Sequence, residues 1–184
     1  MKRLVLLPFL LLPLLVQAQK VTSKELVTQL VKNIHGGVEM HTVDGRQSYY
    51  VYAGTGYKYY FYEQKAYFFP QIDFKWGQYR YDNNNKNYTE TASIALPLTV
   101  GYDLPIKGII NMNVYGGVRY EQIVYTIRNS YTSKVNNAQA GLLGGTTIRL
   151  ADRFGITVSY YYGLTSLYKD GTGRTSSFNF AFLF

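Results

Sequence analysis

The residues best suited to chemistry in this 184-residue chain are its two histidines, His35 and His41, with Glu39 two positions before His41. A histidine working with a serine and an acidic residue is the arrangement of acyl-transfer and deacylase sites. Neither histidine begins a His-x-Ser pair. On an extended strand, residues six apart lie roughly 20 Å from each other, so the two histidines cannot serve one centre. We interpret both as residues of a polar interior or its rim, and keep an acyl-transfer enzyme as the alternative.

Other kinds of site find little support in the composition. The chain has no cysteine, which removes disulfides, thiolate metal sites and cysteine nucleophiles. The GLLGG segment at 141–145 is not a phosphate loop, because no Lys-Ser/Thr pair follows it. The formal net charge is +8, but the basic residues do not share a face with the aromatic ones, so nucleic acid is not an expected partner. We expect no cofactor and no metal.

The period of the sequence indicates which elements must position the histidines. From Ile34 to Phe184, apolar residues alternate with polar or small ones, and this period of two predicts β-strands. Between Tyr49 and Phe61, for example, the odd positions are mostly apolar and Lys58 lies on the opposite face. Eight such strands are expected, over residues 34–43, 49–61, 67–81, 94–102, 110–121, 138–150, 154–164 and 178–184.

The connections between these strands favour a transmembrane β-barrel. Those at 63–66, 103–108 and 151–153 are short, whereas those at 82–91, 128–137 and 169–176 are longer and polar; only the short 44–47 breaks this alternation. Short turns on one rim, longer loops on the other and an even strand number are typical of outer-membrane barrels. A closed barrel also leaves no strand edge unpaired in lipid. The alternative is a soluble, secreted lipocalin-like binder with its apolar face inward.

The segment before the strands has two predicted parts. Lys2 and Arg3 precede a short apolar run that ends near Ala18, which is typical of a cleaved secretory signal over residues 1–18. Residues 19–33 are then expected to form a short periplasmic segment. Within it, Thr22 and Glu25 have the spacing of a capping box, and apolar residues recur at helical intervals. This pattern predicts an amphipathic helix from Ser23 to about Lys32, followed by the barrel over 34–184.

If the apolar face points toward lipid, six charged residues point into the barrel. Three are acidic and three are basic. An eight-stranded barrel is just wide enough to be filled by its own side chains, so charges inside it must pair or face enclosed water. We therefore predict a structural network of ion pairs that plugs the lumen, with an ion or solute path as the sharper alternative. The six residues are Glu39, Lys58, Asp73, Lys75, Arg119 and Glu121.

Several segments of the chain resemble a known family. They are the FPQI run at 69–72, the IALPL run at 94–98, the RFG run at 153–155 and the YYGLT run at 161–165. Together with the strand pattern, they are similar to the "outer membrane protein beta-barrel domain" family of PorT-like and OmpX-like small, porin-like barrels. One departure is Gln71, where the family often has an acidic residue.

The resemblance implies a location, partners and a class of function. It implies an integral protein of the outer membrane of a Gram-negative-type bacterium, non-enzymatic, with a structural, envelope or surface-interaction role or one accessory to secretion. A lipid-modifying enzyme is the alternative. Expected partners are outer-membrane lipid and lipopolysaccharide, the outer-membrane assembly machinery and a surface or secretion-system protein. The chain end is similar to the signal that this machinery reads, which comprises Phe178, Phe180, Phe182 and Phe184.

Overall fold

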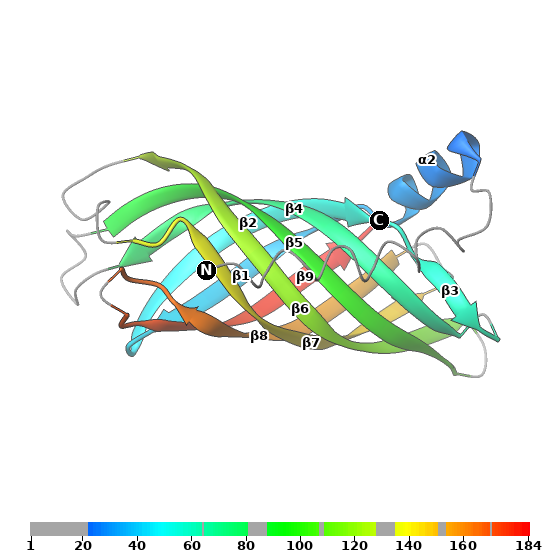
Figure 1. Ribbon diagram of the computed structural model, residues 1–184. Coiled ribbons are helices and arrows are strands. Elements are labelled where there is room, and N and C mark those ends of the chain that lie inside the picture. Colours follow the sequence, from blue (N-terminus) through cyan, green and yellow to red (C-terminus); the bar gives the residue numbers. More distant parts are fainter. Residues whose placement is uncertain are drawn as a thin grey trace, which may run out of the picture.

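The strands of the protein form one closed antiparallel sheet. The computed structural model describes residues 22–63, 65–80, 88–106, 109–127, 135–150, 154–169 and 171–184. Strand β1 (His35–Val43) pairs with β2 (Arg46–Gly56) on one side and with the last strand, β9 (Arg174–Leu183), on the other. Because β2 also pairs with β4 (Ala66–Arg80), the sheet closes on itself as a barrel (Figure 1).

The barrel has eight positions around its circumference, which confirms the predicted fold class. Strand β3 (Tyr59–Tyr62) continues β2 after a break at Tyr57 and Lys58, and both strands pair with β4, so they occupy one position. The expectation of a single strand over 49–61 is wrong in this respect. The remaining strands are β5 (Tyr88–Pro105), β6 (Ile110–Ile127), β7 (Ala138–Leu150) and β8 (Phe154–Ser166).

Several strands extend beyond the apolar alternation that predicts them. Strand β5 begins at Tyr88 instead of residue 94 and runs to Pro105, so the connections expected at 82–91 and 103–108 are shorter than predicted. Strand β9 likewise begins at Arg174. The added residues include Thr89 and Thr91, whose side chains are buried in the lumen. A ladder of backbone hydrogen bonds needs no apolar outer face, so polar strand ends escape a search for alternating hydrophobicity.

Two prolines lie inside central strands, where each removes a hydrogen-bond donor from the ladder. The β4–β5 pairing runs to Pro70 opposite Leu98 and resumes at Asp73 opposite Ala95. Pro97 falls within the same interval on β5. The two prolines therefore share one interruption of one ladder, and most of the barrel's pairing is left intact.

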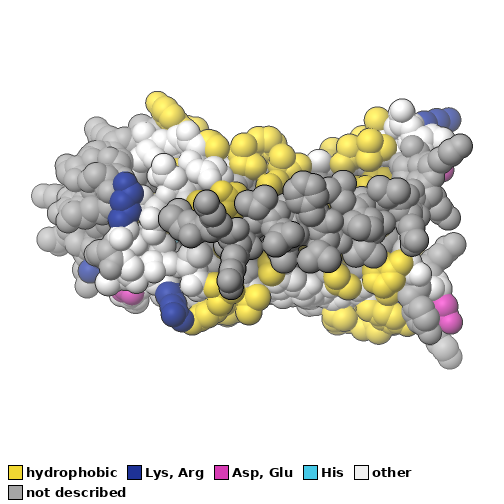
Figure 2. Space-filling model, in the orientation of Figure 1, with side chains coloured by type: hydrophobic (Ala, Val, Ile, Leu, Met, Phe, Trp, Pro, Cys, Tyr) yellow, Lys and Arg dark blue, Asp and Glu magenta, His cyan; other side chains and the backbone are white. Residues whose placement is uncertain are grey.

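The outer face of the barrel is apolar and the inner face is polar. On β1, Val38 and Met40 are exposed, whereas Glu39 and His41, which alternate with them, are buried. Figure 2 shows exposed hydrophobic side chains around the waist of the molecule, with basic and acidic side chains toward the ends. A lipocalin-like barrel would have the opposite polarity, so that alternative is wrong. No helix among the described residues combines the length and hydropathy of a membrane-spanning segment.

The predicted helix, α2 (Ser23–Lys32), lies at the rim where the chain also ends (Figure 1). Its capping box is formed, with Thr22 and Glu25 hydrogen-bonded to each other in both directions. The short turns after β3, β5 and β7 lie at this same rim, which in outer-membrane barrels is the periplasmic one. The longer connections after β4, β6 and β8 lie at the opposite rim. The predicted signal segment, residues 1–18, lies outside the described residues.

Candidate functional site: the charged lumen

Four charged side chains from three strands meet near the middle of the lumen. Lys75 Nζ of β4 lies 2.8 Å from Glu39 Oε2 of β1 and 2.6 Å from Glu121 Oε2 of β6. Arg119, also on β6, lies 2.8 Å from Glu39 Oε1 and 3.4 Å from Glu121 Oε2. Two anions and two cations make the cluster neutral, which is the condition for keeping charges in a low-dielectric interior. We call these four residues the lumen network.

Neutral hydrogen-bond donors complete the lumen network. Ser177 Oγ donates to Glu39 and Ser93 Oγ donates to Glu121. The Asn179 amide, with its nitrogen toward Glu39, donates to both carboxylate oxygens at 3.2 and 3.1 Å. Each carboxylate thus has partners on several strands, so the network fixes the distances between strands that are far apart in the sequence.

Aromatic rings flank both cations. The Arg119 guanidinium lies 3.7 Å from the centre of the Tyr161 ring, and Lys75 Nζ lies 5.0 Å from that of Tyr50. Both tyrosine rings point inward and are almost fully buried. Cation–π contacts of this kind add to the attraction of the carboxylates and exclude water from the cluster. The network residues are consequently only 1–4 % exposed.

The other two charged residues expected in the lumen lie outside the network. Asp73 Oδ1 lies 2.9 Å from His35 Nε2. Lys58 Nζ lies 3.9 Å from the centre of the Tyr67 ring and 3.5 Å from Asp103 Oδ1. All six predicted residues are buried, but they divide into a central cluster of four and two separate pairs nearer the helix-side rim.

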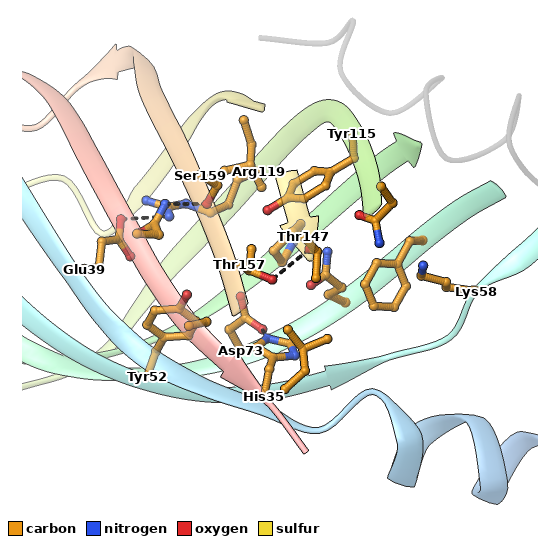
Figure 3. A pocket seen from close by; sticks show the side chains of 18 of the residues that line it. His35, Glu39, Tyr52, Lys58, Asp73, Tyr115, Arg119, Thr147, Thr157 and Ser159 are labelled. Carbon is orange, nitrogen blue, oxygen red and sulfur yellow. Dashed lines mark hydrogen bonds and ion pairs between the residues drawn. The ribbon is translucent and has the colours of Figure 1, made fainter. Parts of the chain in front are cut away.

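A small polar cavity lies between the lumen network and the helix-side rim. Its volume is about 60 Å³, and His35, Asp73, Tyr115, Lys58 and Arg119 are among its lining residues. Figure 3 shows Glu39 and Arg119 at one end of the cavity, Lys58 at the other, and the His35–Asp73 pair between them. A buried water needs roughly 15 Å³ of such volume, so the cavity has room for only a few water molecules.

Apolar side chains close the lumen on the side of the longer loops. Val135 and Leu167, from the connections after β6 and β8, are buried against Val43, Tyr79 and Ile123. The two connections are tied together by a bridge between residues 135 and 168 and by the Asn136 side chain, which donates to two backbone carbonyls. We call Val135 and Leu167, with the strand residues Val43, Tyr79 and Ile123 that they contact, the loop cap. It was not predictable from alternation, because the residues that reach inward follow no strand period.

The two histidines point into the lumen and have different partners. His41 Nε2 lies 3.0 Å from Glu39 Oε1, and the ring packs 4.7 Å from that of Tyr50. His35 accompanies Asp73, and its Nδ1 lies 3.0 Å from the Asn33 carbonyl oxygen. Among the described residues, no group of three or more His, Asp or Glu side chains could hold a metal ion. The long-range partner Asp73 was not apparent from local spacing around His35.

These features define the class of the protein as a closed, eight-stranded transmembrane barrel with a polar interior. The family model described as "Outer membrane protein beta-barrel domain" matches residues 21–169, and the chain belongs to this family. The resemblance inferred from the sequence is thereby confirmed, as is the outer-membrane class. No curated protein sequence gives a significant match.

Comparison with solved structures finds small outer-membrane barrels. The crystal structure of the outer membrane enzyme PagL is similar with a TM-score of 0.56 and 10 % identity, covering 82 % of this chain and 98 % of that one. Neisserial surface protein A (NspA) gives a TM-score of 0.49 and 9 % identity, covering 82 % and 92 %. The attachment invasion locus protein Ail of Yersinia pestis gives 0.43 and 12 %, covering 82 % and 95 %. At these identities the likeness shows the fold alone.

Proposed function

We propose that the protein is a non-enzymatic, non-conducting outer-membrane barrel with a structural role in the envelope and a loop rim available for surface contact. One observation carries this proposal: the lumen network is only 1–4 % exposed, and the cavity beside it has room for only a few water molecules. In a pore, ions and water would pass these charged side chains, and the side chains would be hydrated. The ion or solute path therefore has little support from the geometry.

The alternative of a lipid-modifying enzyme is disfavoured by the position of the histidines. An acyl-transfer site acting on membrane lipid must present its base to the lipid. His35 and His41 are the two histidines of the chain, and both are buried inside the barrel. The lipid-facing surface thus offers no imidazole to activate a serine. The similar fold of the outer membrane enzyme PagL does not support enzymatic activity here, because at 10 % identity the likeness shows only a shared barrel fold.

Contacts at the loop rim are the remaining part of the proposal. Lys169 and Arg174 are exposed there and suit the anionic groups of lipopolysaccharide. Three further basic residues, Lys86, Arg128 and Lys134, stand in the connections predicted at 82–91 and 128–137 and lie outside the described residues. A role accessory to secretion, export by a cleaved signal and recognition by the assembly machinery stay predictions of the sequence pattern.

Lipid analysis separates the structural role from the enzymatic one. Outer membranes from cells expressing the full chain are compared by mass spectrometry with membranes from cells carrying the His35→Ala/His41→Ala double variant. We expect identical phospholipid and lipid A species in both, and in cells without the protein. A new lipid species that requires the chain and disappears in the double variant would establish the enzyme instead.

A further inference from the structure

Helix α2 presents an apolar face that the barrel does not cover. At about 100° per residue, its four apolar residues fall on one arc of roughly 140°, and its charged residues lie outside that arc. Val27 and Val31 on this arc are each 58 % exposed. None of the helix residues is buried. The apolar residues of the arc are Leu26, Val27, Leu30 and Val31.

The lipid-facing surface of the barrel reaches the end of α2. Ile34 follows the helix and precedes β1, and it is exposed on the same outer face as Val38. Its carbonyl oxygen accepts a hydrogen bond from the backbone N–H of Phe184, whose ring is also exposed beside the strand end. Ile34 therefore extends the apolar outer face of the barrel to the residue next to the helix C-cap.

The helix is attached to the barrel at its C-terminal end. Thr55 of β2 donates its hydroxyl to the Leu30 carbonyl, and Asn33, which caps the helix, donates to the Gly56 carbonyl. Arg149 of β7 donates to the Asn33 side chain at 3.0 Å. These bonds hold the helix at the rim, from which it extends away from the barrel (Figure 1).

The polar face of α2 suits phospholipid headgroups. Lys32 and Glu25 lie opposite the apolar arc, and Thr28 lies on the polar side between them and Val31. Lys24 lies at the edge of the arc, next to Val31. A short helix with one apolar and one polar face lies in the plane of a membrane interface, with its apolar side chains at the boundary between headgroups and acyl chains. The rim that carries α2 is the periplasmic one, where the membrane surface is the inner leaflet.

We propose that α2 lies on the inner leaflet of the outer membrane and binds phospholipid through Leu26, Val27 and Val31, acting as a lateral anchor of the barrel. This surface is separate from the lumen, so the inference does not rest on the proposed function. It rests on the placement of the apolar belt in lipid, and it commits to phospholipid as the occupant of the exposed helix face.

Tryptophan fluorescence tests the anchor in the full chain. Trp76 is the single tryptophan, so a Trp76→Phe background allows one reporter to be added. Val27→Trp places it on the apolar face, and Thr28→Trp places it on the polar face as the matched control. Both variants are reconstituted into phosphatidylethanolamine and phosphatidylglycerol vesicles that contain phospholipid brominated near the headgroup end of the acyl chains. A difference in gel migration between heated and unheated samples verifies that each barrel is folded. Val31→Trp repeats the test one helical turn further on.

We expect blue-shifted emission from Val27→Trp and quenching by bromine at least about twofold stronger than for Thr28→Trp, as a helix in the interface requires. Water-like emission and no quenching at Val27→Trp would overturn the proposal. Equal quenching at both positions would also overturn it, because the helix would then have no lipid-facing side. Blue-shifted emission without quenching would mean that protein, such as a second copy of the chain, covers the helix instead.

Discussion

Lys75 Nζ lies 2.6 Å from Glu121 Oε2, although β4 and β6 are not neighbours in the barrel. Strand β5 separates them, so the two side chains meet by reaching inward across the curved wall. Glu39 joins the same lysine from β1. Paired charges therefore fill the middle of this barrel, where a soluble protein of this size has an apolar core, and the apolar residues of the barrel wall face lipid.

Replacing Lys75 by methionine is expected to destabilise the barrel strongly. The change leaves two buried carboxylates with only one of the two cations that they share, and removing one partner of a buried ion pair costs about 3–5 kcal/mol. The temperature at which the folded band disappears from a semi-native gel should fall clearly. Lys65→Met is the matched control, since Lys65 pairs with Glu63 at 3.5 Å with side chains 42 % and 61 % exposed. Exposed pairs contribute about 1 kcal/mol or less. Equal shifts in the two variants would contradict a stabilising lumen network.

Two glycines of β7 should respond differently to alanine. A Cβ at Gly141 would lie 2.5 Å from Cε2 of the buried Tyr161 ring, whereas a Cβ at Gly144 would have the Tyr115 carbonyl oxygen at 3.6 Å as its nearest atom. We expect Gly141→Ala to cost about 1–3 kcal/mol, as overpacking of an interior does. Gly144→Ala should change stability by less than about 0.5 kcal/mol. Urea midpoints of the refolded variants measure both, and a milder effect at Gly141 than at Gly144 would show that the lumen packing is loose.

The terminal aromatic residue is expected to matter for assembly more than for stability. Phe184 is 67 % exposed and Phe61 is 65 % exposed, so truncation of either ring removes a similar lipid contact. If the chain end is read by the assembly machinery, Phe184→Ala should reduce the amount of folded protein in the outer membrane several-fold, and Phe61→Ala should not. Quantifying the folded band from cells expressing each variant decides this. A similar loss of folded protein in both variants would contradict a special role of Phe184 in assembly.

The capping box of α2 predicts a pH dependence outside the membrane. The backbone N–H and the hydroxyl of Thr22 donate to Glu25 at 2.9 Å, which holds the pKa of the Glu25 carboxyl below its ordinary value. A carboxyl with a lowered pKa contributes stability above the unfolded value, and that contribution is lost as the pH falls through the folded one. The cap therefore weakens only in acid. NMR titration of Glu25 in micelles should show its pKa rising in Thr22→Val, and an unchanged titration would mean that the box does not form in solution.

The barrel wall was largely predictable from the sequence, because each strand buries one face and alternation records which face. The same alternation assigned Glu39, Lys75, Arg119 and Glu121 to the inside. The break between β2 and β3 was not predictable, since Tyr57 and Lys58 preserve the alternation on both sides of it. Alternation also gave no sign of the polar ends of β5.

Pairing inside the lumen was beyond local reasoning. His35 and Asp73 meet across 38 positions of sequence, and Lys75 and Glu121 across 46. Such contacts depend on strand register. A register slip of two residues would change the partners of every side chain but would leave each side chain on the same face of the sheet. The loop cap could not be predicted from the sequence for another reason. Val135 and Leu167 stand in polar connections, and only the folded loops place them over the end of the lumen.

Ion conductance tests the sealed lumen most directly. The full chain, refolded and verified by its heat-dependent gel shift, is incorporated into planar lipid bilayers beside a porin that serves as a positive control. A lumen closed by the network around Lys75 and by the loop cap predicts no stepwise current at any applied voltage that the bilayer withstands. Discrete, reproducible channels from the wild-type chain would contradict a plugged interior and would restore the ion path as the function of the lumen charges.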